Sequence, residues 1–198
     1  GVSRTNSRQQ IELLESFVRT ELNRTALRRM AVLRPLRVVV TNWPTDDAGE
    51  PVVEHVELVN NPENPDDGTR NVAVTGVFHI EQYDVMGEPP PKYVRLSRGR
   101  VGRLRGAYFV TATGFDTDGD GNVVEVQVTY DPATRGGNAP DGRKVKSTMH
   151  WVSAAHAVDA TVALYDRLFS AEVPGEATGN ALDDLNPNSR ELLTGAKV

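Results

Sequence analysis

The sequence predicts a mainly β fold, built as antiparallel barrels or sandwiches, with a short α-helical segment near its N-terminal end. Three observations lead to this prediction. Short runs of β-branched and aromatic residues recur from residue 38 onward, turn-forming clusters separate them, and apolar residues at helical spacing dominate only the first part of the chain. The 198 residues suffice for one ordinary domain or two small ones.

The helical segment is expected between Gln9 and about Arg34. Its apolar residues recur at intervals of three and four, which is typical of one face of a helix: Ile11, Leu14, Phe17, Val18 and Leu22. The stretch from Leu27 to Leu33 predicts a second short helical piece, which Pro35 closes.

The strands are expected at residues 38–40, 52–53, 56–59, 72–74, 77–80, 108–110, 123–130 and 151–152. Between them lie turn clusters at residues 61–62, 65–68, 87–91 and 135–138. Many short strands at such spacing are typical of barrels and sandwiches. The stretch 154–169 fits a helix or a strand equally well, and the tail 171–198 is expected to be loosely ordered.

Composition excludes several classes of protein. No apolar run approaches the roughly 20 residues that span a bilayer, and no charged segment precedes an apolar one as in a secretion signal, so we expect a cytoplasmic protein that does not bind membranes. With no Cys and four scattered His, we expect no disulfide, no thiol nucleophile and no metal site.

The net charge of −5 by itself argues mildly against nucleic acid, but the charges are segregated along the chain. Residues 38–91 hold eleven acids and one base, whereas residues 92–109 hold six bases and no acid. Of the 22 basic residues, 18 are Arg, whose planar fork suits base edges and phosphates. A high-Arg composition with solvated faces is the plainer interpretation of the same pattern.

Two motifs suggest chemistry that we do not favour. Residues 116–121 begin like a calcium loop, but the twelfth position is Gln127 where such loops carry Glu, so a hairpin turn is the better interpretation. Ser153 lies between His150 and His156, yet no nucleophile elbow or oxyanion loop accompanies it, so we expect structural roles and no catalytic residue. No glycine-rich phosphate loop is present.

The basic stretch 92–105 is the strongest remaining signal. On a strand, Arg103 and Arg105 share one face while Leu104 points the opposite way, and Gly99 and Gly102 allow a turn or a close approach of the backbone to a ligand. A barrel with one core face and one basic face suits unstacked nucleotides. A charged outer strand on any soluble barrel has the same pattern, so these residues leave both interpretations open.

Several ungapped segments, in the same order along the chain, resemble the C-terminal anticodon-binding region of glutaminyl-tRNA synthetase, a class I aminoacyl-tRNA synthetase. These segments are residues 141–146, 150–156 and 164–169, together with shorter matches at 30–32, 103–105, 129–131 and 186–187. The resemblance covers most of the chain. It implies two antiparallel β-barrels like those of a ribosomal protein, which hold the unstacked anticodon loop.

The resemblance also implies a domain organisation. Residues 1–35 would be a helical connector, the end of the stem-contact region, and residues 36–198 the anticodon-binding barrels, incomplete at the C-terminus. The ATP-binding motifs of the family are absent, so the chain is expected to be catalytically inactive as an excised fragment, with no cofactor of its own, while the intact enzyme uses ATP and Mg²⁺.

Site residues follow from the resemblance by position. Three residues match family positions that approach the second anticodon base: Arg28, Pro62 and Lys92. Asn23 matches a polar residue at the anticodon stem-loop nearby. Arg95 matches the arginine that reads the third base, and Arg103 and Arg105 match a pair near the first base. Five further basic side chains are expected to contact phosphates of the RNA: Arg98, Arg100, Arg143, Lys144 and Lys146. Val94, Glu63 and Gly106 depart from the family pattern, where lysine, asparagine and asparagine stand.

The leading hypothesis is therefore recognition of the anticodon stem-loop of glutamine tRNA by a monomer that binds no DNA, as part of a glutamine–tRNA ligase. One alternative is the anticodon-binding region of a related glutamyl-tRNA synthetase. Another is a protein-interaction β-barrel that binds no RNA and uses the acidic faces of the chain.

Overall fold

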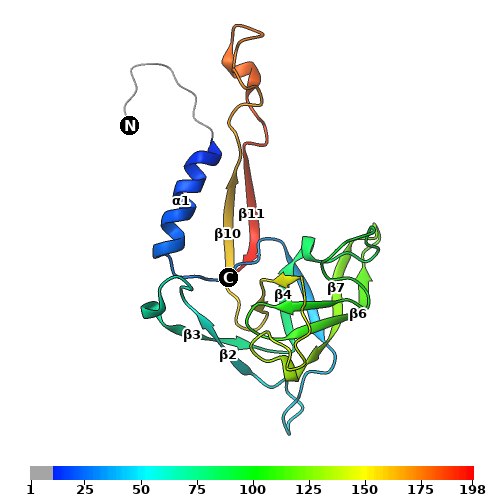
Figure 1. Cartoon of the computed structure of the whole chain (residues 1–198). Coiled ribbons are helices and arrows are strands. Elements are labelled where there is room, and N and C mark those ends of the chain that lie inside the picture. The colour runs from blue at the N-terminus through cyan, green and yellow to red at the C-terminus, as the bar shows by residue number, and fades with distance from the viewer. Residues whose placement is uncertain (1–10) are drawn as a thin grey trace. The chain divides into compact units, whose positions relative to one another are not determined.

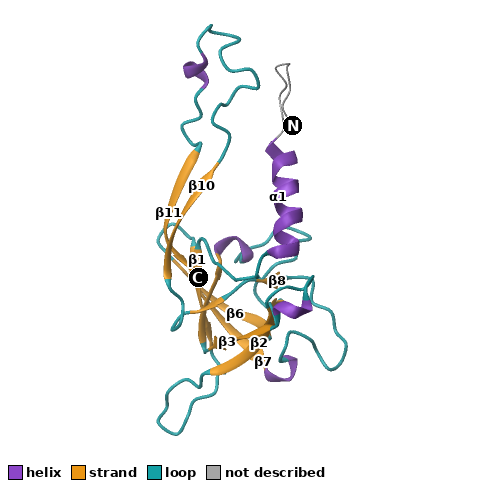
Figure 2. Cartoon of the chain, turned by 90° about the vertical axis from the view of Figure 1, so that its left-hand side faces the viewer, coloured by secondary structure: helices purple, strands orange, loops and turns teal. Residues whose placement is uncertain are grey.

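The computed structural model describes residues 11–198 and divides into two compact units. We call Gly1–Arg29 with Glu57–Val72 the helical unit, and Met30–Val56 with Ala73–Val198 the sheet unit. Strands outnumber helices throughout the described chain (Figures 1 and 2). The prediction of a mainly β fold with a helix in the N-terminal part is confirmed.

The helical unit contains the helix α1 (Ile11–Thr25) and the short 3-10 turn η1 (Pro65–Asp67). Strand β2 (Glu54–Val59) pairs with β3 (Thr69–Val74) in a two-stranded sheet, and η1 lies in the connection between them. The side chain of Asn64 caps η1 by accepting a hydrogen bond from the backbone N–H of Asp66.

The helical prediction is confirmed in its first part and wrong in its second. The apolar stripe forms α1, although its side chains are exposed and Phe17 leaves 66% of its surface in solvent. The segment Leu27–Leu33 is not helical, because Val32 exchanges two backbone hydrogen bonds of 2.8 Å with Lys197 and is fully buried. Pairing with a distant strand overrides the local apolar periodicity here. Gln9 lies outside the described residues.

The sheet unit contains a seven-stranded sheet whose order is β8-β5-β6-β7-β1-β4-β9. Its strands are β1 (Pro35–Val40), β4 (Val77–Glu81), β5 (Val101–Leu104), β6 (Phe109–Thr117), β7 (Val123–Asp131), β8 (Thr148–Met149) and β9 (Val152–Ser153). Two pairings, β1 with β7 and β5 with β8, are parallel, so the sheet is mixed where the sequence predicts antiparallel pairing throughout. The sheet curls around its core (Figure 1).

The sheet unit also contains a two-stranded ribbon. Strand β10 (Asp159–Tyr165) pairs antiparallel with β11 (Arg190–Lys197), and the connection between them contains the 3-10 turn η4 (Ala181–Asp184). The ribbon resolves residues 159–165 of the ambiguous stretch 154–169 as strand, and no residue of the stretch is helical. The prediction of a loosely ordered tail is wrong for β11, whose residues lack β-branched runs but form a ladder with β10.

The core of the sheet unit lies on the inner face of the seven-stranded sheet. Its largest fully buried side chains include Trp151, Phe78, Ile80, Leu96 and Met149. The ring of Trp151 meets that of Phe78 edge-on at 6.4 Å between centroids, and its indole N–H donates to the carbonyl of Arg105 at 3.0 Å. A single side chain thus joins the core to the basic strand region.

Most of the remaining sequence predictions are confirmed. The other predicted strands coincide with strands or their ends, except residues 52–53, which precede β2. The calcium-like motif is a hairpin turn between β6 and β7, in which the Asp118 carboxylate accepts from the backbone N–H groups of Asp120 and Asn122. Ser153 is buried, and its hydroxyl is hydrogen-bonded to Thr75 and His156, which joins β9 to its neighbours.

We expect Trp151→Ala to lower the free energy of unfolding by about 3–5 kcal/mol, because it leaves a large cavity and an unpaired carbonyl at Arg105. Urea denaturation followed by circular dichroism measures the change. Tyr165→Ala is the control, since this ring is 76% exposed and its removal should change stability by less than about 0.5 kcal/mol. Equal losses in the two variants would contradict this assignment of the core.

Candidate nucleic-acid interface

The residues that the sequence singles out fall into two groups, one in each unit. Asn23, Arg28 and Pro62 belong to the helical unit. All the others belong to the sheet unit: Lys92, Arg95, Arg98, Arg100, Arg103, Arg105, Arg143, Lys144 and Lys146.

In the helical unit, Arg28 caps the C-terminal end of α1. Its Nη1 donates to the carbonyls of Ala26 at 2.7 Å and Leu22 at 3.1 Å, and its Nη2 donates to the carbonyl of Asn23 at 2.9 Å. The last carbonyls of a helix lack partners within the helix and carry partial negative charge, so a guanidinium is favourable there. Arg28 also reaches the side-chain oxygen of Asn23 at 3.3 Å, which brings these two predicted residues together.

The Asn60–Asn64 turn carries the third predicted residue of this unit, Pro62. Asn61 is fully buried and donates to the carbonyl of Arg24 at 3.0 Å, while its side-chain oxygen accepts from the N–H of Glu63 at 3.1 Å. The N–H of Arg28 donates to the carbonyl of Asn60 at 2.6 Å. These bonds hold the exposed Pro62 beside the end of α1, and Asn61 is the organising residue that the sequence analysis missed.

In the sheet unit, Arg95 lies on the wall of a pocket of about 380 Å³, which we call the Arg95 pocket. Lys146, one of the predicted phosphate contacts, also lines this pocket. Apart from Val94, the lining residues are polar or charged: Glu81, Tyr83, Asp84, Val94, Arg95, Lys146, Ser147, Thr148 and His150. The pocket is large enough for a nucleobase and is mostly polar in its lining residues. Arg95 and Lys146 are therefore brought together, although 51 positions apart in the sequence.

The backbone around Arg95 is fixed by the core. Leu96 is fully buried, its N–H donates to the carbonyl of Asp84 at 3.0 Å, and its carbonyl accepts from the N–H of Met86 at 3.1 Å. Asp84 ends the 3-10 turn η2 (Gln82–Asp84), which directly follows β4. The two backbone hydrogen bonds of Leu96, to Asp84 and Met86, therefore hold residues 84–86 and 95–96 side by side. This places the Arg95 guanidinium beside the Asp84 carboxylate, with which it forms an ion pair.

Arg103 and Arg105 lie on and just after β5, on the side of β8. The Nε and Nη2 groups of Arg103 donate to the hydroxyl of Thr148 at 2.9 and 2.7 Å. Leu104 is buried between them, as the alternation predicts. Because Thr148 also lines the Arg95 pocket, Arg103 borders that pocket through a shared hydroxyl. Arg105 is exposed, and its charge acts on the neighbouring His150.

Charges in the Arg95 pocket oppose one another. Burial raises the pKa of the Asp84 carboxyl above its ordinary value, and the nearby Arg95 guanidinium counteracts this rise. Burial, together with the charge of Arg105, lowers the pKa of His150, so the neutral imidazole is favoured. The pocket thus presents the donors of Arg95 and Lys146 beside the Asp84 carboxylate, whereas the two carboxylate oxygens of Glu81 already accept from the backbone N–H groups of Leu33 and Arg34.

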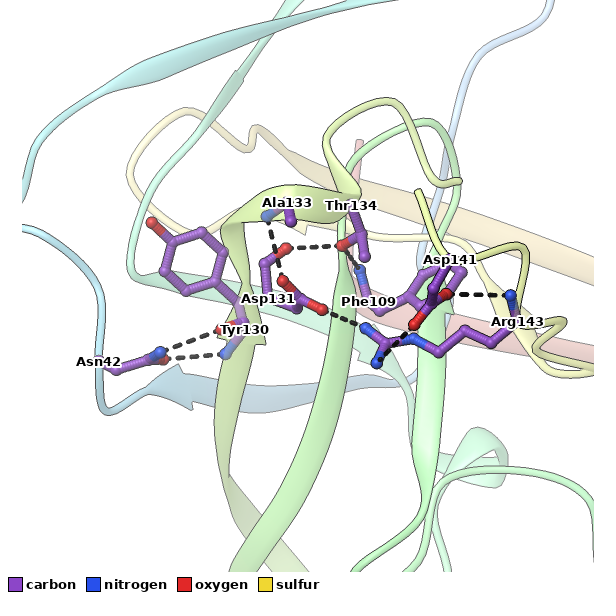
Figure 3. A network of polar contacts seen from close by, with 8 residues as sticks. All are labelled: Asn42, Phe109, Tyr130, Asp131, Ala133, Thr134, Asp141 and Arg143. Atoms are coloured by element: carbon purple, nitrogen blue, oxygen red, sulfur yellow. Dashed lines mark hydrogen bonds and ion pairs between the residues drawn. The ribbon is translucent and has the colours of Figure 1, made fainter. Parts of the chain in front are cut away.

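Arg143 lies in a polar network on the outside of β6 and β7 (Figure 3). Its guanidinium forms ion pairs with Asp131 and, at 3.7 Å, with Asp141, and it lies 5.6 Å from the centre of the Phe109 ring. The Asp131 carboxylate also accepts from the N–H of Ala133 at 3.0 Å, at the start of the 3-10 turn η3 (Pro132–Thr134). Two carboxylates therefore already engage Arg143, which makes it a structural tie between the turn and the following loop.

The remaining basic residues that the sequence singles out do not line the Arg95 pocket. Arg98 lies over the Phe115 ring at 5.7 Å and lines a second hollow of about 530 Å³. Arg100 and Lys144 are exposed in loops. Lys92 is exposed and has a φ of 70°, the one positive φ of a non-glycine residue in the described chain. Gly102 approaches the core, not a ligand site, because a Cβ there would lie 2.6 Å from the Met149 side chain.

Residues 11–198 contain neither a metal-binding cluster nor a helix that could span a membrane. No three His, Asp or Glu side chains in this range are grouped so that they could hold a metal ion. In the same part of the chain, no helix has both the length and the apolar character that crossing a membrane requires.

Comparison with known proteins identifies relatives of this fold. The family model described as "tRNA synthetases class I (E and Q), anti-codon binding domain" matches residues 26–131, and a second model with the same description matches residues 148–198.

Curated relatives match along the whole chain. A protein of Bradyrhizobium diazoefficiens named glutamine–tRNA ligase is 50% identical over 198 residues, which are all of this chain and 34% of the relative. Glutamine–tRNA ligases of Rhodopirellula baltica and Pseudomonas syringae pv. tomato are 46% and 43% identical over 196 and 200 residues, covering 98% and 100% of this chain and 32% and 34% of the relatives. The chain thus spans about a third of the length of these relatives.

We expect Asn61→Ala to loosen the end of α1 and the Pro62 turn together, because it removes two hydrogen bonds of a buried side chain, a loss of about 1–3 kcal/mol. Hydrogen exchange of the backbone N–H groups of Arg28 and Glu63 measures the change, and both should exchange faster. Asn188→Ala, at an exposed position, is the control. Unchanged exchange at both groups would refute the role assigned to Asn61.

Proposed function

The chain belongs to the family of anticodon-binding domains of the class I tRNA synthetases for glutamate and glutamine, and on this premise we propose that it binds the anticodon stem-loop of glutamine tRNA as part of a glutamine–tRNA ligase. Within the ligase, residues 1–35 would be the helical connector and residues 36–198 the anticodon-binding region. We further propose that the ligase acts in the cytoplasm as a monomer that binds no DNA.

The observation that carries this proposal is the Arg95 pocket. Every anticodon for glutamine ends in guanosine, whereas every anticodon for glutamate ends in cytidine. An arginine fork donates two hydrogen bonds to O6 and N7 of guanine, and this is the commonest specific pairing between a side chain and a base. A pocket with a fixed guanidinium and a neighbouring lysine is therefore suited to the base that separates the two amino acids.

Recognition, not bond making, is the task we assign to these residues. An unstacked base enters the pocket, and its edge meets Arg95. Arg103 and Arg105 contact the first base, and the helical unit together with Lys92 contacts the second. A wrong base leaves buried donors unpaired, which costs more than a correct pairing gains. We assign Arg98, Arg100, Lys144 and Lys146 to phosphates, and the engaged Arg143 is the weakest candidate among the predicted phosphate contacts.

Chemistry on ATP belongs to the remainder of the ligase in this proposal. The described residues offer neither a phosphate-binding loop nor a grouped set of metal ligands, so they do not fit ATP or Mg²⁺. We therefore expect the chain alone to lack aminoacylation activity.

We expect the full chain to bind an anticodon stem-loop RNA with the triplet CUG more tightly than one with CUC. Arg95→Ala should weaken binding of the CUG hairpin by about ten- to a hundredfold and bring the two affinities together, since a bidentate contact carries about 1–3 kcal/mol of discrimination. Fluorescence anisotropy of labelled hairpins measures both. Arg190→Ala, which removes an exposed guanidinium at the start of β11, is the control.

The same titrations separate the alternatives. Equal affinities of the unaltered chain for the two hairpins would count against the proposal, and tighter binding of CUC would favour a glutamyl-tRNA synthetase. Binding to RNA should also weaken with salt, with a slope of about −0.7 per phosphate contacted. A flat salt response would favour the protein-interaction barrel, for which the eleven acids of residues 38–91 are the supporting observation.

A further inference from the structure

Asp84 is a nearly buried carboxylate in a pocket that we assign to RNA. Its side chain is 10% exposed, at the end of the 3-10 turn η2. A buried carboxylate without a partner is strongly unfavourable, and here the Nη1 of Arg95 supplies the partner. The pairing is thus necessary for Asp84, whereas the half-exposed Arg95 would be well solvated without it.

Arg95 is held on three sides. The buried Leu96 fixes its backbone, the Asp84 carboxylate fixes one corner of its guanidinium, and the Tyr83 ring lies 4.8 Å from the guanidinium carbon. Among the described residues, no hydrogen bond engages Nε or Nη2 of Arg95. One edge of the fork, with two parallel donors, is therefore left for a ligand.

We propose that Asp84 is a positioning residue for reading the third anticodon base: it sets the plane of the Arg95 fork so that Nε and Nη2 meet the acceptors of guanine. This inference rests on the function proposed above and goes beyond it by naming the residue through which Arg95 acts. A fork that is already oriented loses less conformational freedom on binding, and it discriminates better because a misplaced base cannot re-aim it.

Arg143 shows how the arrangement at Arg95 differs from a structural ion pair. Two carboxylates, Asp131 and Asp141, engage the Arg143 guanidinium on the sheet exterior. Arg95 has one carboxylate, and its second contact is the face of Tyr83, a ring that is itself 62% exposed. A single anchor with an aromatic platform restrains the cation without saturating its donors.

Asp84→Asn in the full chain tests the inference, because the amide keeps the shape of the side chain and removes its charge. We expect the ratio of affinities for the CUG and CUC hairpins to fall by about tenfold, with a smaller change in binding to the CUC hairpin. In the Arg95→Ala background, where the two affinities already coincide, the same substitution should leave the affinity for the CUG hairpin unchanged, since Asp84 acts through Arg95.

Glu125→Gln is the matched control, because it removes the carboxylate of the Arg37–Glu125 ion pair, between β1 and β7 and outside the pocket, and should leave the ratio unchanged. Melting curves establish that each variant folds. If Asp84→Asn does not fold, Asp84→Ser, which is smaller and also uncharged, takes its place.

The outcomes distinguish this inference from the function on which it rests. If the unaltered chain does not distinguish the two hairpins, the proposed function fails. If the unaltered chain distinguishes them and a folded Asp84 variant retains the full ratio, the positioning role is overturned while the proposed function stands. A further loss of affinity for the CUG hairpin on adding Asp84→Asn to Arg95→Ala would also overturn it, because Asp84 would then act independently of Arg95.

Discussion

The ion pair between Asp84 and Arg95 joins the core of the sheet unit to the surface that we assign to RNA. Its two residues are fixed by backbone hydrogen bonds between Asp84, Met86 and the fully buried Leu96, so the position of a surface cation depends on aliphatic packing beneath it. Long basic side chains lose conformational entropy when a ligand orders them. Where the protein itself supplies the order, more of the contact energy remains for distinguishing one base from another.

The arginines of the sheet unit differ in how completely the protein engages them. Arg143 is engaged by two carboxylates and ties a turn to a loop. Arg103 is held by two neutral groups, the Thr148 hydroxyl and, at 3.4 Å, the Gly137 carbonyl, which a base edge can replace at low cost. Arg95 lies between these cases, with one anchor and a free edge. The same residue type thus serves the fold at one position and recognition at another, and the number of partners distinguishes the two roles.

Local patterns in the sequence predict most of the secondary structure. The apolar stripe predicts α1, and the alternation around Leu104 predicts its burial between the half-buried Arg103 and the exposed Arg105. Predictions fail where a distant segment decides the structure: Val32 is extended because it pairs with Lys197, and β11 forms because β10 lies beside it. Predictions of the candidate site are limited in the same way. Family resemblance indicates Arg95 and Arg103, but their partners Asp84 and Thr148 lie 11 and 45 positions away, and no local pattern pairs them.

If the Asp84 carboxylate positions the fork, the Arg95 guanidinium is oriented before RNA binds. ¹⁵N relaxation of the arginine Nε–H groups in the free full chain measures this most directly, because it reports the mobility of each fork on the ps–ns timescale. We expect the Nε–H of Arg95 to be much more restricted than that of the exposed Arg100, and to become mobile in the Asp84→Asn variant. Equal mobility of Arg95 and Arg100 in the unaltered chain would contradict the claim.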